Sequence, residues 1–323
     1  MKLAAITCLY GCRETARQRA NYWACAAALK AQGVDLWTVQ GLLPWQYHAE
    51  AIDGERMLWV PIRDFLWHKE RLLSLGVSRL PDEYDAVLWV DADVTFDLPD
   101  IRERIEQVLE KYQILQPWSD AIYHDEAGRP LNGVFDVTQP GAPNFGRWLW
   151  EVPKFLRRSA AAVNWEQETY VRAHTGLAWA ARREWFDQVG LYEYSLGGNG
   201  DETLCEGLWG VSDAIARANY SRPHWAHVLR WIARCYDAVR GQVGYVPGTI
   251  RHLWHGPIRG RGYRVRQLQL RASGFDPTPH LIDQPGEALA WSDTAPAGLV
   301  AWMREYFRRN VIWRTVGVSP PVG

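Results

Sequence analysis

Short apolar runs alternate with amphipathic segments along the first 115 residues. Runs that are apolar throughout predict buried strands, and segments in which apolar residues recur every three or four positions predict helices. The predicted strands are 2–10, 35–40, 56–62 and 86–93, and the predicted helices are 15–32, 64–76 and 100–112. Because such an alternation is typical of a parallel sheet covered on both faces, this part of the chain predicts an α/β fold with a mostly parallel sheet.

The second half of the chain shows a less regular pattern. Residues 116–164 are rich in Pro, Gly and aromatic residues, which predicts loops and short elements that shape a cleft. The elements predicted after this stretch are a strand at 174–181 and helices at 182–189, 202–210 and 299–310. We therefore divide the chain into three parts, 1–115, 116–275 and 276–323.

Composition adds limits on the class of protein. A chain of 323 residues with 47% hydrophobic content is long enough to bury a sizeable core. The chain contains no run of about 18 apolar residues and no signal-peptide pattern at its start, so we expect no membrane span and a cytoplasmic location. The five cysteines are scattered without paired CxxC spacing, which favours reduced thiols.

Charge is unevenly distributed. The net charge is −1, yet residues 214–271 contain eleven Arg, no Lys and one acid, Asp237. Guanidinium groups bind phosphate oxygens in pairs of hydrogen bonds, and Trp225, Trp231 and Trp254 in this span could stack on a base or sugar. The alternative is a coding bias, with 31 Arg against 5 Lys, in which the arginines line solvated helix faces.

Two aspartates follow the apolar run of residues 86–90. Asp91 and Asp93 lie where the predicted fourth strand stops, and sheets of this class bind ligands at the carboxyl ends of their strands. Two neighbouring carboxylates in an apolar setting are unfavourable unless a cation or hydrogen-bond donors share their charge. A solvated turn is the alternative, but the return to Val94 and Phe96 favours a divalent metal.

A glycine-rich turn precedes a third acid. Gly197, Gly198 and Gly200 stand just before Asp201, and glycines let a backbone approach a ligand closely. Asp201 is either a functional acid or simply the cap of the helix that follows.

Two histidines lie three residues apart near the end of the second part. His252 and His255 would face one ion if the strand turns at Trp254, whereas on a straight strand they would face opposite sides. Two buried, hydrogen-bonded histidines are the alternative. Carboxylate and imidazole ligands together suit Mn²⁺ or Mg²⁺ better than a structural Zn²⁺ site.

Four segments of the chain resemble a known family: "WHKERLL", "LWVDADV", "HTGLAWAARREWFDQVGLY" and "RHLWHGPIRGRGYRVRQLQL". The family is that of metal-dependent glycosyltransferases with the GT-A fold. The motifs are most similar to inverting β-galactosyltransferases, and to phage and environmental glycosyltransferases, some linked to modification of 5-hydroxymethylcytosine in viral DNA. The resemblance covers about residues 1–275. It implies a Rossmann-like nucleotide-sugar-binding half at 1–115, continuous with an acceptor and catalytic half at 116–275, and 276–323 would pack back onto the first part.

The resemblance also implies a role for each motif. Asp93 would bind the metal together with His255 and His252, and Asp91 would hold the ribose or sugar of a UDP-sugar. Asp201 would take the proton from an acceptor hydroxyl that attacks the anomeric carbon from the opposite face, which inverts the configuration. The other donor-binding residues that the resemblance implies are Thr7, Tyr10, Lys69, Arg71, Gly198 and Arg261.

Several alternatives stay open on the sequence alone. Lys69 and Arg71 could instead be charges on a helix surface. The resemblance and the Arg-rich span point to 5-hydroxymethylcytosine in DNA as the acceptor, in a bacterial host cytoplasm if the protein is viral, and a saccharide or lipid-linked acceptor is the alternative. A nucleotidyltransferase or a nucleotide-binding module is the competing class, although a two-metal site would need a third carboxylate near Asp91 and Asp93.

Overall fold

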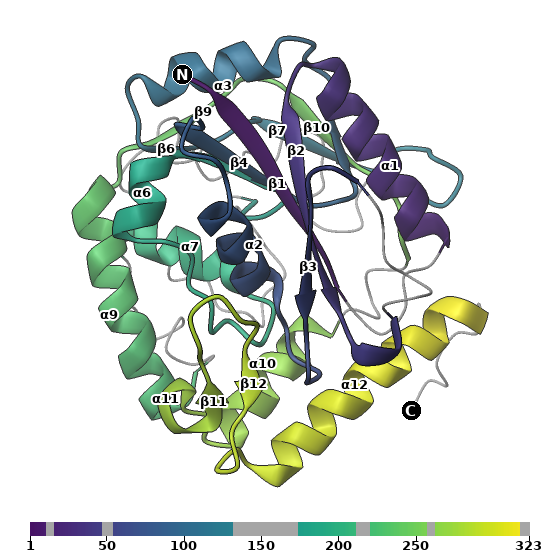
Figure 1. Cartoon of the computed structure of the whole chain (residues 1–323), viewed down its shortest axis with the longest axis vertical. Helices are drawn as coiled ribbons and strands as arrows, with labels where there is room; N and C mark the ends of the chain where they lie inside the picture. Colours follow the sequence, from purple (N-terminus) through teal and green to yellow (C-terminus); the bar gives the residue numbers. More distant parts are fainter. Residues whose placement is uncertain (11–15, 47–53, 132–173, 211–219, 257–261, 317–323) are drawn as a thin grey trace.

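The computed structural model describes residues 1–10, 16–46, 54–131, 174–210, 220–256 and 262–316 (Figure 1). Its centre is a seven-stranded sheet in the order β3-β2-β1-β4-β8-β6-β9. These strands are β1 (Leu3–Tyr10), β2 (Asp35–Leu42), β3 (Met57–Pro61), β4 (Ala86–Val90), β6 (Ile114–Gln116), β8 (Ala178–Arg182) and β9 (Val243–Tyr245). Of these seven strands, β8 alone runs antiparallel to its neighbours. The predicted mixed α/β class with a mostly parallel sheet is confirmed.

Helices cover both faces of this sheet (Figure 1). Alternate residues of β1 divide between two cores: Ala4 and Ile6 pack on the face of α2, α6, α7 and α9, whereas Leu3 and Ala5 pack on the face of α1 and α3. The side chains alternate because successive residues of a strand point to opposite faces, and both faces are apolar because both are buried. The helices are α1 (Ala16–Ala31), α2 (Lys69–Ser78), α3 (Ile101–Leu109), α6 (Arg183–Gln188), α7 (Gly200–Trp209), α9 (Arg222–Val239), α10 (Tyr263–Ala272), α11 (Pro277–His280) and α12 (Ala297–Val316), with a 3₁₀ turn at Pro44–Gln46.

A second, three-stranded sheet lies beyond the carboxyl end of β4. Its order is β5-β10-β7, formed by β5 (Val94–Phe96), β10 (Thr249–His252) and β7 (Asp120–Tyr123). β10 pairs antiparallel with β5, which sets His252 opposite Val94, and the backbone N–H of Leu253 donates to the carbonyl of Asp93 at 2.7 Å. Strand pairing therefore brings residue 252 beside residue 93, although 159 positions separate them in the sequence.

The C-terminal segment packs against the start of α2. Its hairpin, β11 (Leu281–Ile282) and β12 (Ala290–Trp291), and the long helix α12 share an apolar cluster with Leu66 and Phe275. The backbone N–H of Trp291 donates to the carboxylate of Asp64 at 3.0 Å. The division of the chain into three parts stays a prediction, but this contact accords with a C-terminal segment that folds back. Among the described residues no helix is both long and apolar enough to cross a membrane.

Several element boundaries differ from those predicted. The helix expected at 64–76 begins only at Lys69; before it, the Asp64 carboxylate accepts the backbone N–H of Trp291, and Leu66 packs in the apolar cluster of the C-terminal segment. The helix expected after Asp201 begins at Gly200 with Asn199 as N-cap, so Asp201 lies inside its first turn and is not the cap. Residues 132–173, which include most of the predicted loop region 116–164, lie outside the described residues.

Candidate functional site

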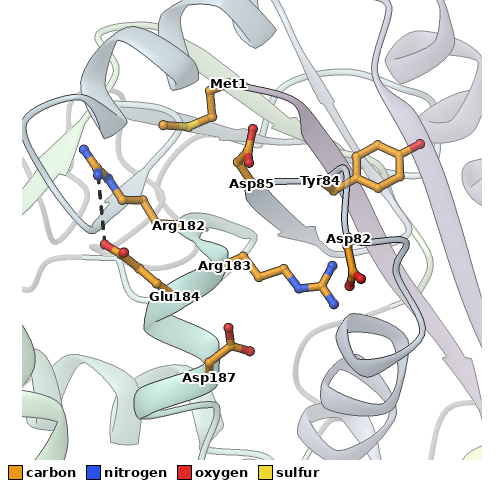
Figure 2. Close-up of a pocket in the computed structure, with 8 residues that line it drawn as sticks. All are labelled: Met1, Asp82, Tyr84, Asp85, Arg182, Arg183, Glu184 and Asp187. Carbon is orange, nitrogen blue, oxygen red and sulfur yellow. Dashed lines mark ion pairs between the residues drawn. The ribbon is translucent and has the colours of Figure 1, made fainter.

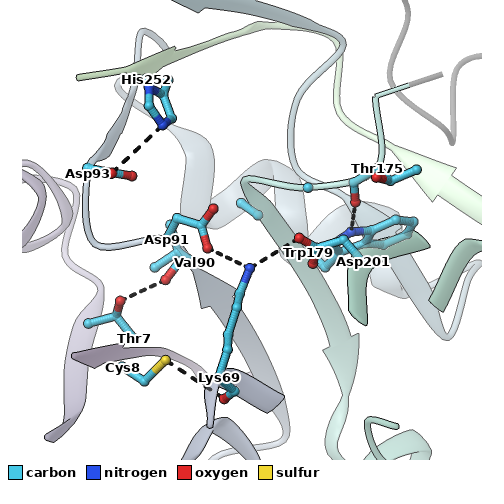
Figure 3. A network of polar contacts seen from close by, with 12 residues as sticks. Thr7, Cys8, Lys69, Val90, Asp91, Asp93, Thr175, Trp179, Asp201 and His252 are labelled. Atoms are coloured by element: carbon cyan, nitrogen blue, oxygen red, sulfur yellow. Dashed lines mark hydrogen bonds and ion pairs between the residues drawn. The ribbon is translucent and has the colours of Figure 1, made fainter. Parts of the chain in front are cut away.

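Polar side chains from the β4–β5 connection, α2, α7 and β10 converge at the carboxyl end of β4 (Figure 3). Asp91 follows β4 directly, Asp93 precedes β5, Lys69 opens α2 and Asp201 lies in the first turn of α7. The end of β10 supplies His252. This is the edge of the sheet where the sequence placed the site, since parallel strands present their ligand-binding loops at their carboxyl ends.

Asp93, His252 and His255 form one group that could hold a metal ion. One ligand atom from each of the three lies within 4.8 Å of the others. The Nε2 atom of His255 is 3.1 Å from Oδ2 of Asp93, and the Nε2 atom of His252 is 3.8 Å from the same oxygen. β10 ends at His252, so the chain turns before His255 and both imidazoles reach the same side. One carboxylate and two imidazoles are a donor set for a divalent transition-metal ion.

Lys69 bridges the other two acids of the site (Figure 3). Its Nζ atom lies 2.8 Å from Oδ1 of Asp91 and 3.1 Å from Oδ2 of Asp201. Burial lowers the pKa of Lys69, but the carboxylates of Asp201 and Asp91 outweigh burial and raise it well above its ordinary value. Lys69 therefore stays charged, and its ammonium group lies between the two carboxylates and binds both.

Asp91 has a perturbed pKa. The pKa of Asp91 is raised to about 6, chiefly by burial; Lys69 opposes this shift, and the nearby charges of Asp201 and Asp93 add to it. Its backbone N–H donates to the carbonyl of Leu177 at 2.8 Å. Leu177 has a φ of 74°, in the left-handed region that side-chain-bearing residues rarely adopt, and strain of this kind gathers at functional sites.

The position of Asp201 depends on a glycine from another element. A Cβ atom built on Gly176 would lie 3.0 Å from Oδ2 of Asp201, so a side chain at this position would press on the carboxylate. The glycine and the strained Leu177 stand directly before β8, which places that loop against both Asp91 and Asp201.

Two residues that the sequence did not single out border the site. The ring of Tyr123 stacks on His252, with 4.4 Å between ring centroids, and its hydroxyl lies 2.6 Å from Nε2 of His174. Nδ1 of His174 accepts the backbone N–H of Gly176, and burial lowers the pKa of His174 to about 3, so this imidazole is neutral at pH 7. The apolar pattern did not predict β7, because only one of its four residues is buried.

The predicted donor-binding residues lie in different surroundings. Thr7 is fully buried and its hydroxyl donates to the carbonyl of Val90 at 2.7 Å, so it joins β1 to β4 and presents no surface to a ligand. Tyr10 packs edge-on against Trp67 and His68. Lys69 is paired with two carboxylates and is largely buried, which argues against the alternative that it is only a charge on the helix surface. Arg261, like its neighbour Arg259, lies outside the described residues.

Gly198 has a structural reason for being glycine. Its φ is 73°, and a Cβ atom there would lie 2.8 Å from Nη2 of Arg266 and 3.0 Å from the ring of Trp67. Arg266 is almost fully buried and lies over the Trp67 ring, 4.2 Å from the centroid. The glycine thus makes room for a cation that the sequence did not distinguish from the other arginines.

Arg71 points away from the predicted donor site. Its guanidinium is paired with Glu193 and, at 3.0 Å, with Asp283, and it donates to the carbonyls of Gln284 and Glu287. These partners engage all three guanidinium nitrogens, and those at residues 283–287 tie α2 to the C-terminal segment. We therefore leave Arg71 out of the donor site and give it a structural role.

The Arg-rich span does not form one continuous basic face in the described part of the chain. Arg251 is paired with the carboxylate of Asp97 at 2.6 Å, and Arg266 is buried. The arginines of this span that are exposed are Arg222, Arg230 and Arg234 on α9, Arg240 just past its end, and Arg271 at the end of α10. Within the described residues, the exposed arginines of this span therefore lie mainly on α9 and just past its end.

A separate pocket lies at the opposite edge of the central sheet (Figure 2). It has a volume of about 380 Å³ and lies between the starts of β1 and β4 and the start of α6. Its two arginines are engaged, since Arg183 donates to the carbonyls of Leu80 and Pro81 and Arg182 to those of Leu109 and Glu110. This pocket is remote from the acids and histidines described above.

No protein-family model matches the chain, and no curated protein matches it. Among solved structures, the catalytic domain of Drosophila β1,4-galactosyltransferase 7 in complex with xylobiose overlaps 75% of this chain at 15% identity, with a TM-score of 0.35. The chain spans 64% of the length of that structure. Glucosyl-3-phosphoglycerate synthase from Mycobacterium tuberculosis in complex with Mn²⁺ and UDP-glucose overlaps 90% of this chain and 86% of its own at 13% identity, with a TM-score of 0.42. Overlaps at such low identity and TM-score assign neither a reaction nor a substrate to this chain.

Proposed function

We propose that this protein is a metal-dependent inverting glycosyltransferase of the GT-A type that moves a sugar from a UDP-sugar to an acceptor hydroxyl. The observation that carries the proposal is the pairing of two groups at one sheet edge. Asp93, His252 and His255 form a group of metal-ligand type, and Lys69 holds Asp91 and Asp201 together beside it. The first group would hold the ion that serves a diphosphate donor, and a carboxylate of the second would be the base that takes the proton from an acceptor hydroxyl.

The metal-ligand group fits a divalent ion by its chemistry. Asp93, His252 and His255 would hold the ion, which when bound would neutralise charge that develops on the departing UDP. Asp91 accepts hydrogen bonds from hydroxyls of the donor, and Lys69 keeps it oriented. Asp201 takes the proton from the acceptor hydroxyl, in a first helical turn where the α7 dipole favours a carboxylate.

The competing class, a two-metal nucleotidyltransferase, fits the geometry less well. Two ions a few ångströms apart need carboxylates that bridge them. Within the described residues the metal-ligand group has a single carboxylate, and Asp91 is occupied by the ammonium group of Lys69. A site for one ion beside a lysine-bound pair of acids favours glycosyl transfer.

A release assay tests the proposed reaction. UDP-glucose, UDP-galactose and UDP-GlcNAc are each incubated with the protein and MnCl₂, with and without an acceptor, and free UDP is measured. We expect UDP release from at least one donor, abolished by EDTA and restored by Mn²⁺. If no donor is bound or turned over with any metal, the proposal is wrong.

For the acceptor we propose the hydroxymethyl group of 5-hydroxymethylcytosine in DNA. The exposed arginines of α9 support a polyanionic acceptor, because phosphate contacts provide most of the affinity for DNA. The same assay with DNA that contains the modified base should release UDP only with that DNA and add the mass of one hexose to its nucleosides. Release that does not depend on DNA would redirect the search to saccharide or lipid-linked acceptors.

Replacing Asp93 with alanine should abolish metal binding. Because changes to outer-shell partners of a metal already lower affinity about 10–100-fold, loss of a direct ligand should weaken Mn²⁺ binding by more than about 100-fold. Calorimetric titration with MnCl₂ measures this, and UDP binding that depends on Mn²⁺ should disappear in parallel. Asp97→Ala is the matched control, because this nearby acid pairs with Arg251. Unchanged Mn²⁺ affinity in Asp93→Ala would contradict the metal assignment.

A further inference from the structure

Glu70 is a buried carboxyl group that the proposed reaction does not use. It follows Lys69 in the first turn of α2 and is 5% exposed. Among the described residues its Oε2 atom has no hydrogen-bond partner. A buried carboxyl is unfavourable unless it is neutral or paired, so its retention beside the candidate site calls for an explanation.

The carboxyl of Glu70 lies directly against the start of α7. A Cβ atom built on Gly200 would lie 1.9 Å from Oε1 of Glu70 and 2.3 Å from its carboxyl carbon. Glu70 therefore fills the space that a side chain at position 200 would take. Because Asp201 is the next residue along the backbone, the place of the Glu70 carboxyl and the place of the candidate base are set together.

The surroundings of Glu70 favour its neutral form. Burial raises the pKa of Glu70 to about 8; Lys69 opposes this shift and the charge of Asp201 adds to it. The titratable groups that interact electrostatically with Glu70 are Lys69 on α2, Cys8 and Tyr10 on β1, Asp91 after β4 and Asp201 on α7. The pKa values of Lys69, Cys8 and Tyr10 are all raised, so these three groups keep their charge states as Glu70 ionises.

We propose that Glu70 is a positioning residue for the transfer reaction. Its carboxyl group packs against Gly200 and so fixes the position of Asp201. Because this carboxyl is neutral, it does not compete with Asp91 and Asp201 for the ammonium group of Lys69. The part that concerns catalysis rests on the proposed function. Ionised Glu70 would compete for the ammonium group of Lys69 and add a negative charge where an anionic donor must bind. The active form is therefore the protonated one, and activity is lost as the pH rises through about 8.

Thermal stability tests the inference without any assay of activity. Since the folded-state pKa of Glu70 lies above the ordinary value, its contribution to stability is complete below about pH 4.5 and is lost as the pH rises through about 8. Glu70→Gln keeps the shape and cannot ionise, so its melting temperature relative to the unmodified protein should rise between pH 5 and pH 9. Glu184→Gln, another first-turn glutamate but exposed, is the matched control and should show no such trend. A pH-independent difference for Glu70→Gln would overturn the inference.

The pH profile of kcat/KM tests the catalytic part. For the unmodified enzyme we expect a fall of about tenfold from pH 7 to pH 9, because one unit above the pKa about one tenth of the groups stay protonated. Glu70→Gln should keep its activity at pH 7 and lose this alkaline limb, a change that a merely structural role would not produce. An unchanged alkaline limb in Glu70→Gln would refute the role. If the unmodified protein turns over no donor, the proposed function fails, and the stability comparison still decides the state of Glu70.

A second pair of variants guards against misfolding of Glu70→Gln. Gly200→Ala introduces a Cβ atom into the space of the Glu70 carboxyl and should lower kcat by at least about tenfold through displacement of Asp201. Adding Glu70→Ala removes the obstacle, so the double variant should recover part of that loss. Strictly additive effects of the two changes would show that the positions are uncoupled and contradict the proposal.

Discussion

Replacing Asp201 with asparagine should lower kcat for transfer by about 10²–10⁴-fold, the usual contribution of a positioned general base. The amide keeps the size of the carboxylate but cannot take the proton of the acceptor hydroxyl. Binding of UDP and Mn²⁺ should persist, because the metal-ligand group of Asp93, His252 and His255 does not include Asp201 and Lys69 retains Asp91 as a partner. Single-turnover kinetics together with calorimetry separate the two effects.

Glu202→Gln is the matched control for this variant. Glu202 is the next acid in the same helical turn, and we expect its amide variant to keep transfer within a few-fold of the unmodified enzyme. If Asp201→Asn is active and Glu202→Gln is inactive, the base is Glu202 and not Asp201. Loss of metal and UDP binding together with activity in Asp201→Asn would make Asp201 structural.

Arg71→Ala should lower the free energy of unfolding by about 3 kcal/mol, near the lower end for a broken buried ion pair because Asp283 is partly exposed. The change leaves Glu193 without its cation and two carbonyls of the C-terminal segment without their donor. Denaturant titration measures the loss. Arg102→Ala on the exposed face of α3 removes only a surface pair and should change stability by less than about 1 kcal/mol.

The Arg71 variants also separate the structural role from the donor-binding role that the sequence suggested. Arg71→Lys keeps the charge but cannot serve several acceptors in a plane, so it should recover only part of the lost stability. UDP affinity should be unchanged in the portion of each variant that is folded. Normal stability with weakened UDP binding would return Arg71 to the donor site.

The sequence predicted the sheet for a simple physical reason, whereas the grouping of Asp93 with His252 and His255 came from the family resemblance. Apolar strands that stop at acids are local patterns, and the three-residue spacing of His252 and His255 is local too. The class of the fold and the place of Asp91 at the end of β4 follow from such patterns, and the structure bears them out. The functional roles of these residues stay predictions.

Contacts across long sequence distances could not be predicted in this way. Whether a helical cation such as Lys69 or Arg71 faces the site or the C-terminal segment depends on the rotation of α2 about its axis, which is set by how the helix packs on the sheet. Glu70 shows no signal in the sequence, because its partner is a glycine 130 positions away whose missing side chain is the contact. The parallel pairing of β7 with β10 places Tyr123 beside His252, and the sequence pattern did not reveal this pairing.

The first turn of α2 carries three consecutive residues with three different destinations. Lys69 pairs with Asp91 and Asp201, Glu70 packs against the start of α7, and Arg71 binds residues 283–287. These side chains share one helical turn, so a displacement of the hairpin should be transmitted through that turn to Asp91 and Asp201. The hairpin is thus mechanically coupled to the candidate site through α2, so substitutions at residues 283–287 and at the site should not have additive effects.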